Sequence, residues 1–221
     1  MNVSKKITVS LVASTLISVV LAILTVSGRF APGDCSLANT AYALRTPTLT
    51  LALKIITTLG EWYVYAAIAL LLLALPKTRW KYGLPATLAL GLSAVLNALL
   101  KYCFAIPRPI GHHLITETGF GFPSGHAMIG TAFIGLCALL FARYASRMID
   151  KLVFFVLAIA FILAVGFSRV YLGVHNPSDI FAGYMMGVFC CLCALGVIDF
   201  LQKRGVLNTV EERFERALIR R

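Results

Sequence analysis

The chain has 221 residues, of which 59% are hydrophobic and 13% are charged. This composition, with a mean hydropathy of +0.87, excludes an ordinary soluble globular protein and predicts membrane-spanning helices. The formal net charge of +11 does not indicate nucleic-acid binding, because no basic surface interleaved with aromatic residues accompanies it.

Six apolar stretches follow one another along the chain, and a helix needs about 20 residues to cross a bilayer. The first stretch is uncharged and follows two lysines. It is too long for the apolar part of a cleaved signal peptide, and no Ala-x-Ala-like site follows it. We therefore expect an all-α, polytopic membrane protein with six transmembrane helices in one bundle. The stretches are residues 7–26, 57–75, 82–101, 126–141, 152–167 and 180–198.

Basic residues are concentrated before the first stretch, between alternate stretches and after the last one. By the positive-inside rule, this pattern predicts a multi-pass protein of the inner (plasma) membrane with both termini in the cytoplasm. The basic residues on this side are Lys5, Lys6, Lys77, Arg79, Lys81, Arg143, Arg147, Lys151, Lys203, Arg204, Arg213, Arg216, Arg220 and Arg221.

No internal repeat or low-complexity linker divides the chain, so residues 1–221 are expected to form a single membrane-embedded domain. Its polar motifs form a core between positions 101 and 179. Near the C-terminus, apolar residues share one helical face beside arginines, so residues 200–221 are predicted to form a cytoplasmic amphipathic tail.

Three short motifs carry polar and charged residues that a bilayer strongly disfavours unless they have a function. When six stretches cross the membrane, the motif-bearing ends of four of them fall on the face opposite the termini, the outer or periplasmic face. There the motifs would supply three fixed cations, two imidazoles and a carboxylate, a set suited to binding and cleaving a phosphate ester. The motifs are Lys101 to Arg108-Pro109, Pro123-Ser124-Gly125-His126, and Ser168-Arg169 with His175 and Asp179.

Helix-start signals accompany the second and third motifs. Ser124 is in position to act as an N-cap, Gly125 allows a close backbone approach, and free N–H groups at a helix start attract anions. Asn176 and Pro177 suit the N-cap and N1 positions of the last helix. Taken singly, each polar residue could have a purely structural role; Asp179, for example, could complement the helix dipole. None of these roles explains the joint spacing.

With all three motifs complete and in order, the chain resembles the type-2 phosphatidic acid phosphatase family, relatives of the vanadium haloperoxidases. The resemblance implies a metal-independent phosphatase that works through a phosphohistidine, without a cofactor. It implies that His175 is the nucleophile, that Asp179 accepts the other ring N–H, and that His126 is the general acid and base. The phosphate-binding residues implied are Lys101, Arg108, Ser124, Gly125 and Arg169. No cluster of Asp and Glu in the sequence suggests a metal site.

A site at the outer head-group level implies a lipid that keeps its chain in the bilayer and presents its phosphate laterally. The external position favours undecaprenyl diphosphate over phosphatidylglycerol phosphate and phosphatidic acid. A lipid phosphotransferase would use the same residues with another acceptor. A non-catalytic lipid transporter is less favoured, because the chain lacks inverted repeats. The oligomeric state is left open.

Two further polar residues lie in the apolar stretches. Glu61, next to Trp62 near the outer end of the second stretch, either borders the substrate entrance or forms a structural ion pair. Asn97, inside the third stretch, is expected to make a hydrogen bond between helices.

Overall fold

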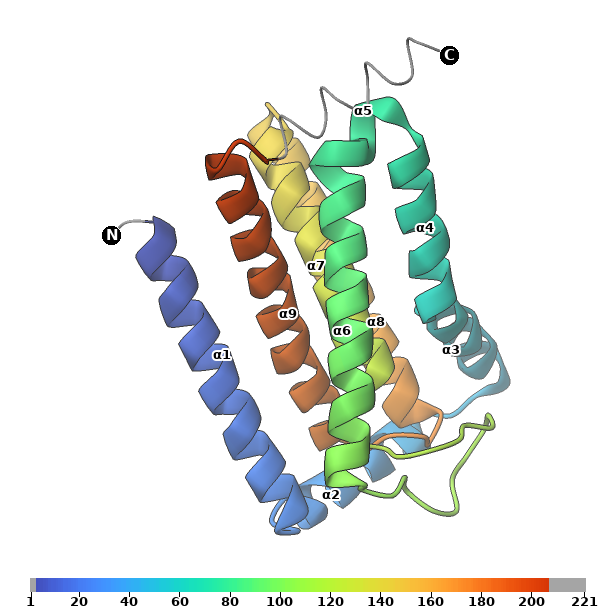
Figure 1. Ribbon diagram of the computed structural model, residues 1–221. Coiled ribbons are helices and arrows are strands. Elements are labelled where there is room, and N and C mark those ends of the chain that lie inside the picture. The colour runs from blue at the N-terminus through green and yellow to red at the C-terminus, as the bar shows by residue number, and fades with distance from the viewer. Residues whose placement is uncertain (1–2, 207–221) are drawn as a thin grey trace.

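The computed structural model describes residues 3–206, and the regular secondary structure in this range is all helical, as predicted (Figure 1). The part of the predicted amphipathic tail beyond residue 206 lies outside the described residues. The helices are α1 (Val3–Val26), α2 (Ala31–Ala43), α3 (Pro47–Leu59), α4 (Trp62–Ala74), α5 (Pro76–Thr78), the π-helical turn η1 (Arg79–Gly83), α6 (Leu84–Phe104), α7 (Gly125–Tyr144), α8 (Met148–Tyr171) and α9 (Pro177–Lys203).

Four helical segments in the described chain are long and apolar enough to cross a membrane. They are Pro76–Phe104, which joins α5, η1 and α6, and the helices α7, α8 and α9. Two bent pairs would each add one span: Leu11–Val26 with α2, bent by 91°, and α3 with α4, bent by 46°. The structure thus shows four to six candidate spans, where the sequence predicted six.

The predicted second span, residues 57–75, is not one helix. Helix α3 already begins at Pro47 and ends at Gly60, which is its C-cap, and Glu61 is extended before α4 starts. Gly60 is needed there because a Cβ atom would lie 2.7 Å from Cγ1 of Val165 on α8. Close packing of α3 on α8 therefore sets the break, and the break leaves Glu61 at a helix start.

Helix α7 forms the centre of the bundle and packs against α6, α8 and α9 (Figure 1). Its inward-facing side chains, including Met128, Phe133 and Leu136, are at most 1% exposed. By contrast, α8 exposes large apolar side chains such as Val156 and Leu163 on its outer side. An apolar surface of this extent is suited to lipid rather than to water.

The three motifs lie at one end of the bundle. The long loop of residues 105–124 and helices α2 and α3 lie at this end, which we call the loop end (Figure 1). The start of α1 and the end of α9 lie at the opposite end (Figure 1). Residues of the motifs occupy the end of α6, the start of α7, the end of α8 and the start of α9.

Two glycines on α9, one helical turn apart, allow α9 to pack closely against α7. A Cβ atom on Gly187 would lie 2.6 Å from the carbonyl oxygen of Met128, and one on Gly183 would lie 2.8 Å from that of Ser124. Small residues spaced in this way are typical of closely packed membrane helices. Their packing brings the start of α7 close to the start of α9.

Replacement of Gly187 by Ala should therefore force α9 away from α7. We expect a loss of about 1–3 kcal/mol of stability, as for other overpacked cores, and a lower melting temperature of the detergent-solubilised protein. Gly196→Ala on the same helix is the matched control, because no atom lies within 4 Å of the added Cβ. Equal melting temperatures for the two variants would contradict this role for Gly187.

Candidate active site

A cavity of about 260 Å³ opens at the loop end of the bundle. Six of the eight predicted site residues line it, and they come from all three motifs: Lys101, Arg108, Gly125, His126, Arg169 and His175. The other two, Ser124 and Asp179, are buried, with 0% and 1% of their surface exposed. The cavity suits a phosphate or diphosphate group, since pockets for whole drug-sized ligands are commonly larger, about 300–1,000 Å³.

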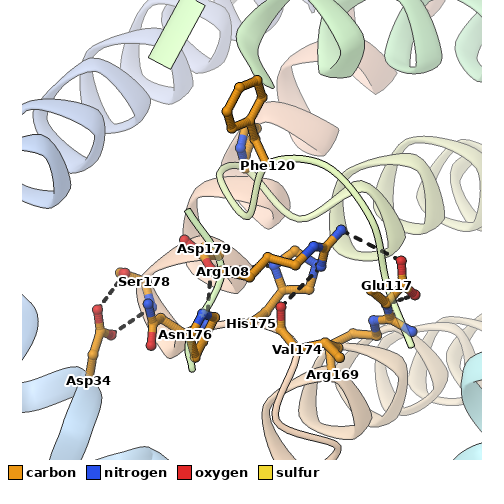
Figure 2. Close-up of polar contacts among 12 residues, drawn as sticks. Asp34, Arg108, Glu117, Phe120, Arg169, Val174, His175, Asn176, Ser178 and Asp179 are labelled. Atoms are coloured by element: carbon orange, nitrogen blue, oxygen red, sulfur yellow. Dashed lines mark hydrogen bonds and ion pairs between the residues drawn. The ribbon is translucent and has the colours of Figure 1, made fainter. Parts of the chain in front are cut away.

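His175 lies between Arg108 of the first motif and Asp179 of the third motif (Figure 2). Its Nε2 is 3.1 Å from Nη1 of Arg108, and its Nδ1 is 3.3 Å from Oδ2 of Asp179. A guanidinium can only donate hydrogen bonds, so Nε2 accepts from Arg108 and Nδ1 carries the ring proton. In this tautomer the lone pair of Nε2 faces Arg108, another residue of the cavity lining.

The turn between α8 and α9 holds His175 in place. Gly173 has a φ of +82°, and a Cβ atom there would lie 2.2 Å from the carbonyl oxygen of His112. As predicted, Asn176 is the N-cap of α9 and Pro177 follows it. The N–H of Asn176 donates to Oδ2 of Asp179 over 2.9 Å, so one carboxylate oxygen contacts both the helix start and the imidazole.

The second motif starts α7 beside this turn. Ser124 occupies the N-cap position as predicted, but its hydroxyl makes no capping hydrogen bond. Its N–H donates to the carbonyl oxygen of Asp179 over 3.1 Å, which joins the two helix starts directly. Asn97 donates to the carbonyl oxygen of Pro123 over 3.2 Å and, between helices as expected, to Sδ of Met128 on α7 over 3.6 Å. Gly125 packs closely on Asn97, since a Cβ atom at Gly125 would lie 3.1 Å from Oδ1 of Asn97.

The first motif holds its cations with backbone carbonyl groups of the loop. The ammonium group of Lys101 donates to the carbonyl oxygen of Phe120. Arg108 donates to the carbonyl oxygens of Thr118 and Gly119 over 3.1 and 3.2 Å, and to that of Val174 over 3.0 Å. The loop therefore wraps around two cations of the cavity, its own Arg108 and Lys101 from the end of α6.

Arg169 is the most deeply buried cation of the site, with 1% of its surface exposed. Its Nη1 donates to Oγ1 of Thr57 over 2.8 Å, and its Nη2 donates to Oε1 of Glu117. Its Nε is buried and makes no hydrogen bond to any residue between 3 and 206. That N–H group can therefore donate to an anion in the cavity.

Glu117 is a site residue that the sequence analysis did not identify. It lines the cavity and also lies 3.5 Å from Nη2 of Arg108, so it bridges the two arginines (Figure 2). Burial raises the pKa of Glu117, but the charge and hydrogen bond of Arg169, together with the charges of Arg108 and His126, hold that pKa below its usual value. The sequence offered one clue to Glu117, which is the single acidic residue between Pro109 and Pro123.

Glu61 lines the cavity and contacts His126, and this contact is an ion pair only when His126 is protonated. Its Oε1 lies 3.3 Å from Nε2 of His126, and both residues line the cavity. Ligand atoms of Glu61, Glu117 and His126 lie within 4.8 Å of one another. The sequence suggested no Asp and Glu cluster for a metal site, and it missed this group because the fold joins residues that are far apart in the chain.

A second missed residue is Asp34, which supports the site from helix α2. Its Oδ1 accepts from the N–H of Ser178 over 2.9 Å, and its Oδ2 accepts from the hydroxyl of Ser178 over 2.6 Å (Figure 2). Asp34 thus fixes the first turn of α9 next to Asp179. A lone Asp in a small-residue helix carries no sequence pattern that would reveal this contact.

The sequence and the fold match known proteins. The PAP2 superfamily model matches residues 82–203, more than half of the chain. Phosphatidylglycerophosphatase B of Bacillus subtilis is 28% identical over 77% of this chain and 85% of its own length. Undecaprenyl-diphosphatase of Sulfolobus acidocaldarius is 31% identical over 69% of this chain and 70% of its own.

A solved structure agrees with these sequence matches. A transmembrane PAP2-type phosphatidylglycerolphosphate phosphatase from Bacillus subtilis superposes with a TM-score of 0.77 at 26% identity. The superposition covers 87% of this chain and 97% of the other. Together with the three motifs and the apolar helices, these matches establish that the chain belongs to the PAP2 superfamily, among its membrane lipid phosphatases.

Proposed function

We propose that this protein hydrolyses the terminal phosphate of a membrane lipid through a phosphohistidine on His175, and that undecaprenyl diphosphate is its substrate. The observation that carries the proposal is the position of the His175 ring in the cavity. One ring nitrogen faces Arg108 and the other faces Asp179. A nucleophile oriented by a third group, next to cations, is the arrangement that phosphoryl transfer requires.

The neutral state of His175 supports its role as nucleophile. Burial, and then the charges of Arg169, Arg108 and Lys101, hold the pKa of His175 well below its usual value. The ring therefore stays neutral at neutral pH, with its single proton on Nδ1, and Nε2 keeps a lone pair for attack. Attack by Nε2 on phosphorus forms the N–P bond as the bond to the leaving oxygen breaks, and Asp179 stabilises the charge that develops on the ring.

Lys101, Arg108 and Arg169 would bind the phosphoryl oxygens, with the backbone near Gly125 and the hydroxyl of Ser124 as neutral donors. Ser124 Oγ is buried and has no hydrogen-bond partner among residues 3–206, as is true of Arg169 Nε. His126 would donate a proton to the leaving oxygen, then accept one from the water that hydrolyses the phosphohistidine. In this scheme the carboxylate of Glu117 pairs with the arginines and that of Glu61 contacts His126. The reaction would proceed without a metal ion.

The printed names of the relatives support two substrate classes. The Sulfolobus relative is named as an undecaprenyl-diphosphatase and the Bacillus relative as a phosphatidylglycerophosphatase. We favour the diphosphate because the basic residues predict an external site, where the carrier lipid of cell-wall synthesis is released as its diphosphate. Phosphatidylglycerol phosphate or phosphatidic acid is the second candidate, and a lipid phosphotransferase is the third.

We further propose that residues 1–221 form one membrane-embedded domain with the motif core at 101–179. Each bent pair, α1 with α2 and α3 with α4, would cross the bilayer once and make six spans in total. Both termini would lie in the cytoplasm and the cavity on the outer face of the plasma membrane. The clustering of Lys and Arg at one end supports this orientation.

Phosphate release from a panel of purified lipids tests the activity. We expect the highest kcat/KM with undecaprenyl diphosphate, and activity that survives EDTA. His175→Ala should lower turnover by a factor on the order of a thousand or more, since a nucleophile is lost. His113→Ala, at an exposed loop position outside the cavity lining, is the control. Much faster cleavage of diacyl phosphates would overturn the proposed substrate, and phosphate transfer to a second lipid would favour the phosphotransferase.

The protonation state of His175 can be measured directly by NMR of protein with labelled histidines, of which the chain has four. The lowered pKa predicts that His175 stays neutral as the pH falls through about 6.5, where an ordinary histidine gains a proton. Arg108→Gln removes a nearby positive charge, so the pKa of His175 should rise. Arg143→Gln, whose partner Asp199 lies on the last turns of α9, should leave it unchanged. A wild-type His175 that titrates near 6.5 would refute this account.

Reporter fusions test the orientation. Fusions after Arg108 and after His175 should be active only with a reporter that works outside the cytoplasm. Fusions after Lys81 and Lys151 should be active only with a cytoplasmic reporter. The reverse pattern would place the cavity on the inner face and remove the argument for the external carrier lipid.

A further inference from the structure

Glu117 makes contacts that a bound phosphate would need. It accepts a hydrogen bond from Nη2 of Arg169 and lies 3.5 Å from Nη2 of Arg108. The arginine side chains are 1% and 10% exposed, so few other groups compete for them. A bidentate contact between a guanidinium and phosphate oxygens uses the same N–H groups that a carboxylate uses.

The remaining donors of the two arginines are largely engaged. Arg169 directs Nη1 to Thr57, and Arg108 directs Nη1 to Val174 and His175. Nε of Arg169 has no partner among residues 3–206, but a phosphate that also binds Nη2 of both arginines must take the place of the Glu117 carboxylate. The Glu117 side chain is 23% exposed at the cavity, so it can turn outward without a change in the buried helices.

A displacement of this kind depends on the charge of the incoming group. Coulomb attraction to the arginines grows in proportion to ligand charge and is strong where water is excluded. A terminal phosphate or diphosphate carries about two or more negative charges near neutral pH, whereas a phosphodiester carries one. The single charge of a diester only equals that of Glu117, and Glu61 adds a second carboxylate nearby.

We propose that Glu117 is a specificity-determining residue, an internal competitor that admits terminal phosphates and rejects the phosphodiester head groups of bulk phospholipids. The proposal rests on the proposed function, in that the two arginines bind the substrate phosphate. Competition by Glu117 would keep the cationic cavity available for a scarce substrate when phosphodiester lipids are abundant.

The first test measures binding of inorganic phosphate to the full-length protein in detergent, by calorimetry, and requires no turnover. Glu117→Gln keeps an oxygen that can accept from Arg169 but removes the competing charge. We expect about tenfold tighter phosphate binding, which corresponds to about 1.4 kcal/mol. Asp150→Asn, a carboxylate-to-amide change at the exposed start of α8, should leave phosphate affinity unchanged.

Unchanged or weaker phosphate binding in Glu117→Gln would overturn the proposal, because a residue that only positions the arginines would weaken anion binding when altered. Glu117→Ala is the second variant if Glu117→Gln does not remain monodisperse, and the same direction of change is expected. Calorimetry also separates the two proposals: a wild-type protein that binds phosphate but cleaves no lipid would refute the proposed function alone.

The second test concerns selectivity. Hydrolysis of the preferred lipid is measured in mixed micelles with increasing phosphatidylglycerol, a phosphodiester. We expect weak inhibition of the wild type and about tenfold stronger competitive inhibition of Glu117→Gln, seen as a rise in KM at constant kcat. Equal inhibition of both proteins would show that Glu117 does not select against diesters and would overturn the proposal.

Discussion

The structure depends on neutralising three cations that are largely buried around one cavity. Removing charges from water costs several kcal/mol per ion unless each charge finds partners. The loop of residues 105–124 supplies most of these partners, through backbone carbonyl groups for Lys101 and Arg108 and through Glu117 for Arg169. The same hydrogen bonds therefore fix both the cations and the conformation of the loop.

A second constraint is the distance between the two histidine motifs. They lie at the starts of α7 and α9, and the N–H of Ser124 donates to the carbonyl oxygen of Asp179. Gly183 and Gly187 allow the two helices to approach closely enough for this contact. Asp34 fixes the first turn of α9 from the opposite side. The geometry of the site thus depends on helix packing well below the cavity.

These two constraints explain why the cavity can be both charged and embedded in an apolar bundle. Polar contacts are concentrated at the loop end, while α8 presents apolar side chains along its outer side. Glu117 neutralises the buried charge of Arg169. In our proposal, a more highly charged ligand displaces its carboxylate. The same ion pairs would then stabilise the buried arginines and make the site selective for a highly charged ligand.

The sequence by itself determined the helical class, the approximate position of most helices and the motifs at their ends. Long apolar runs in a bilayer must satisfy their backbone internally, which leaves helices as the outcome, and the signals at Asn176 and Pro177 act over a few residues. Only the tertiary structure decided the break at Gly60 and Glu61, the pairing of Arg169 with Thr57 and Glu117, and the support from Asp34. Those contacts join residues far apart in the chain, and their energy comes from burial and charge pairing that no local pattern records.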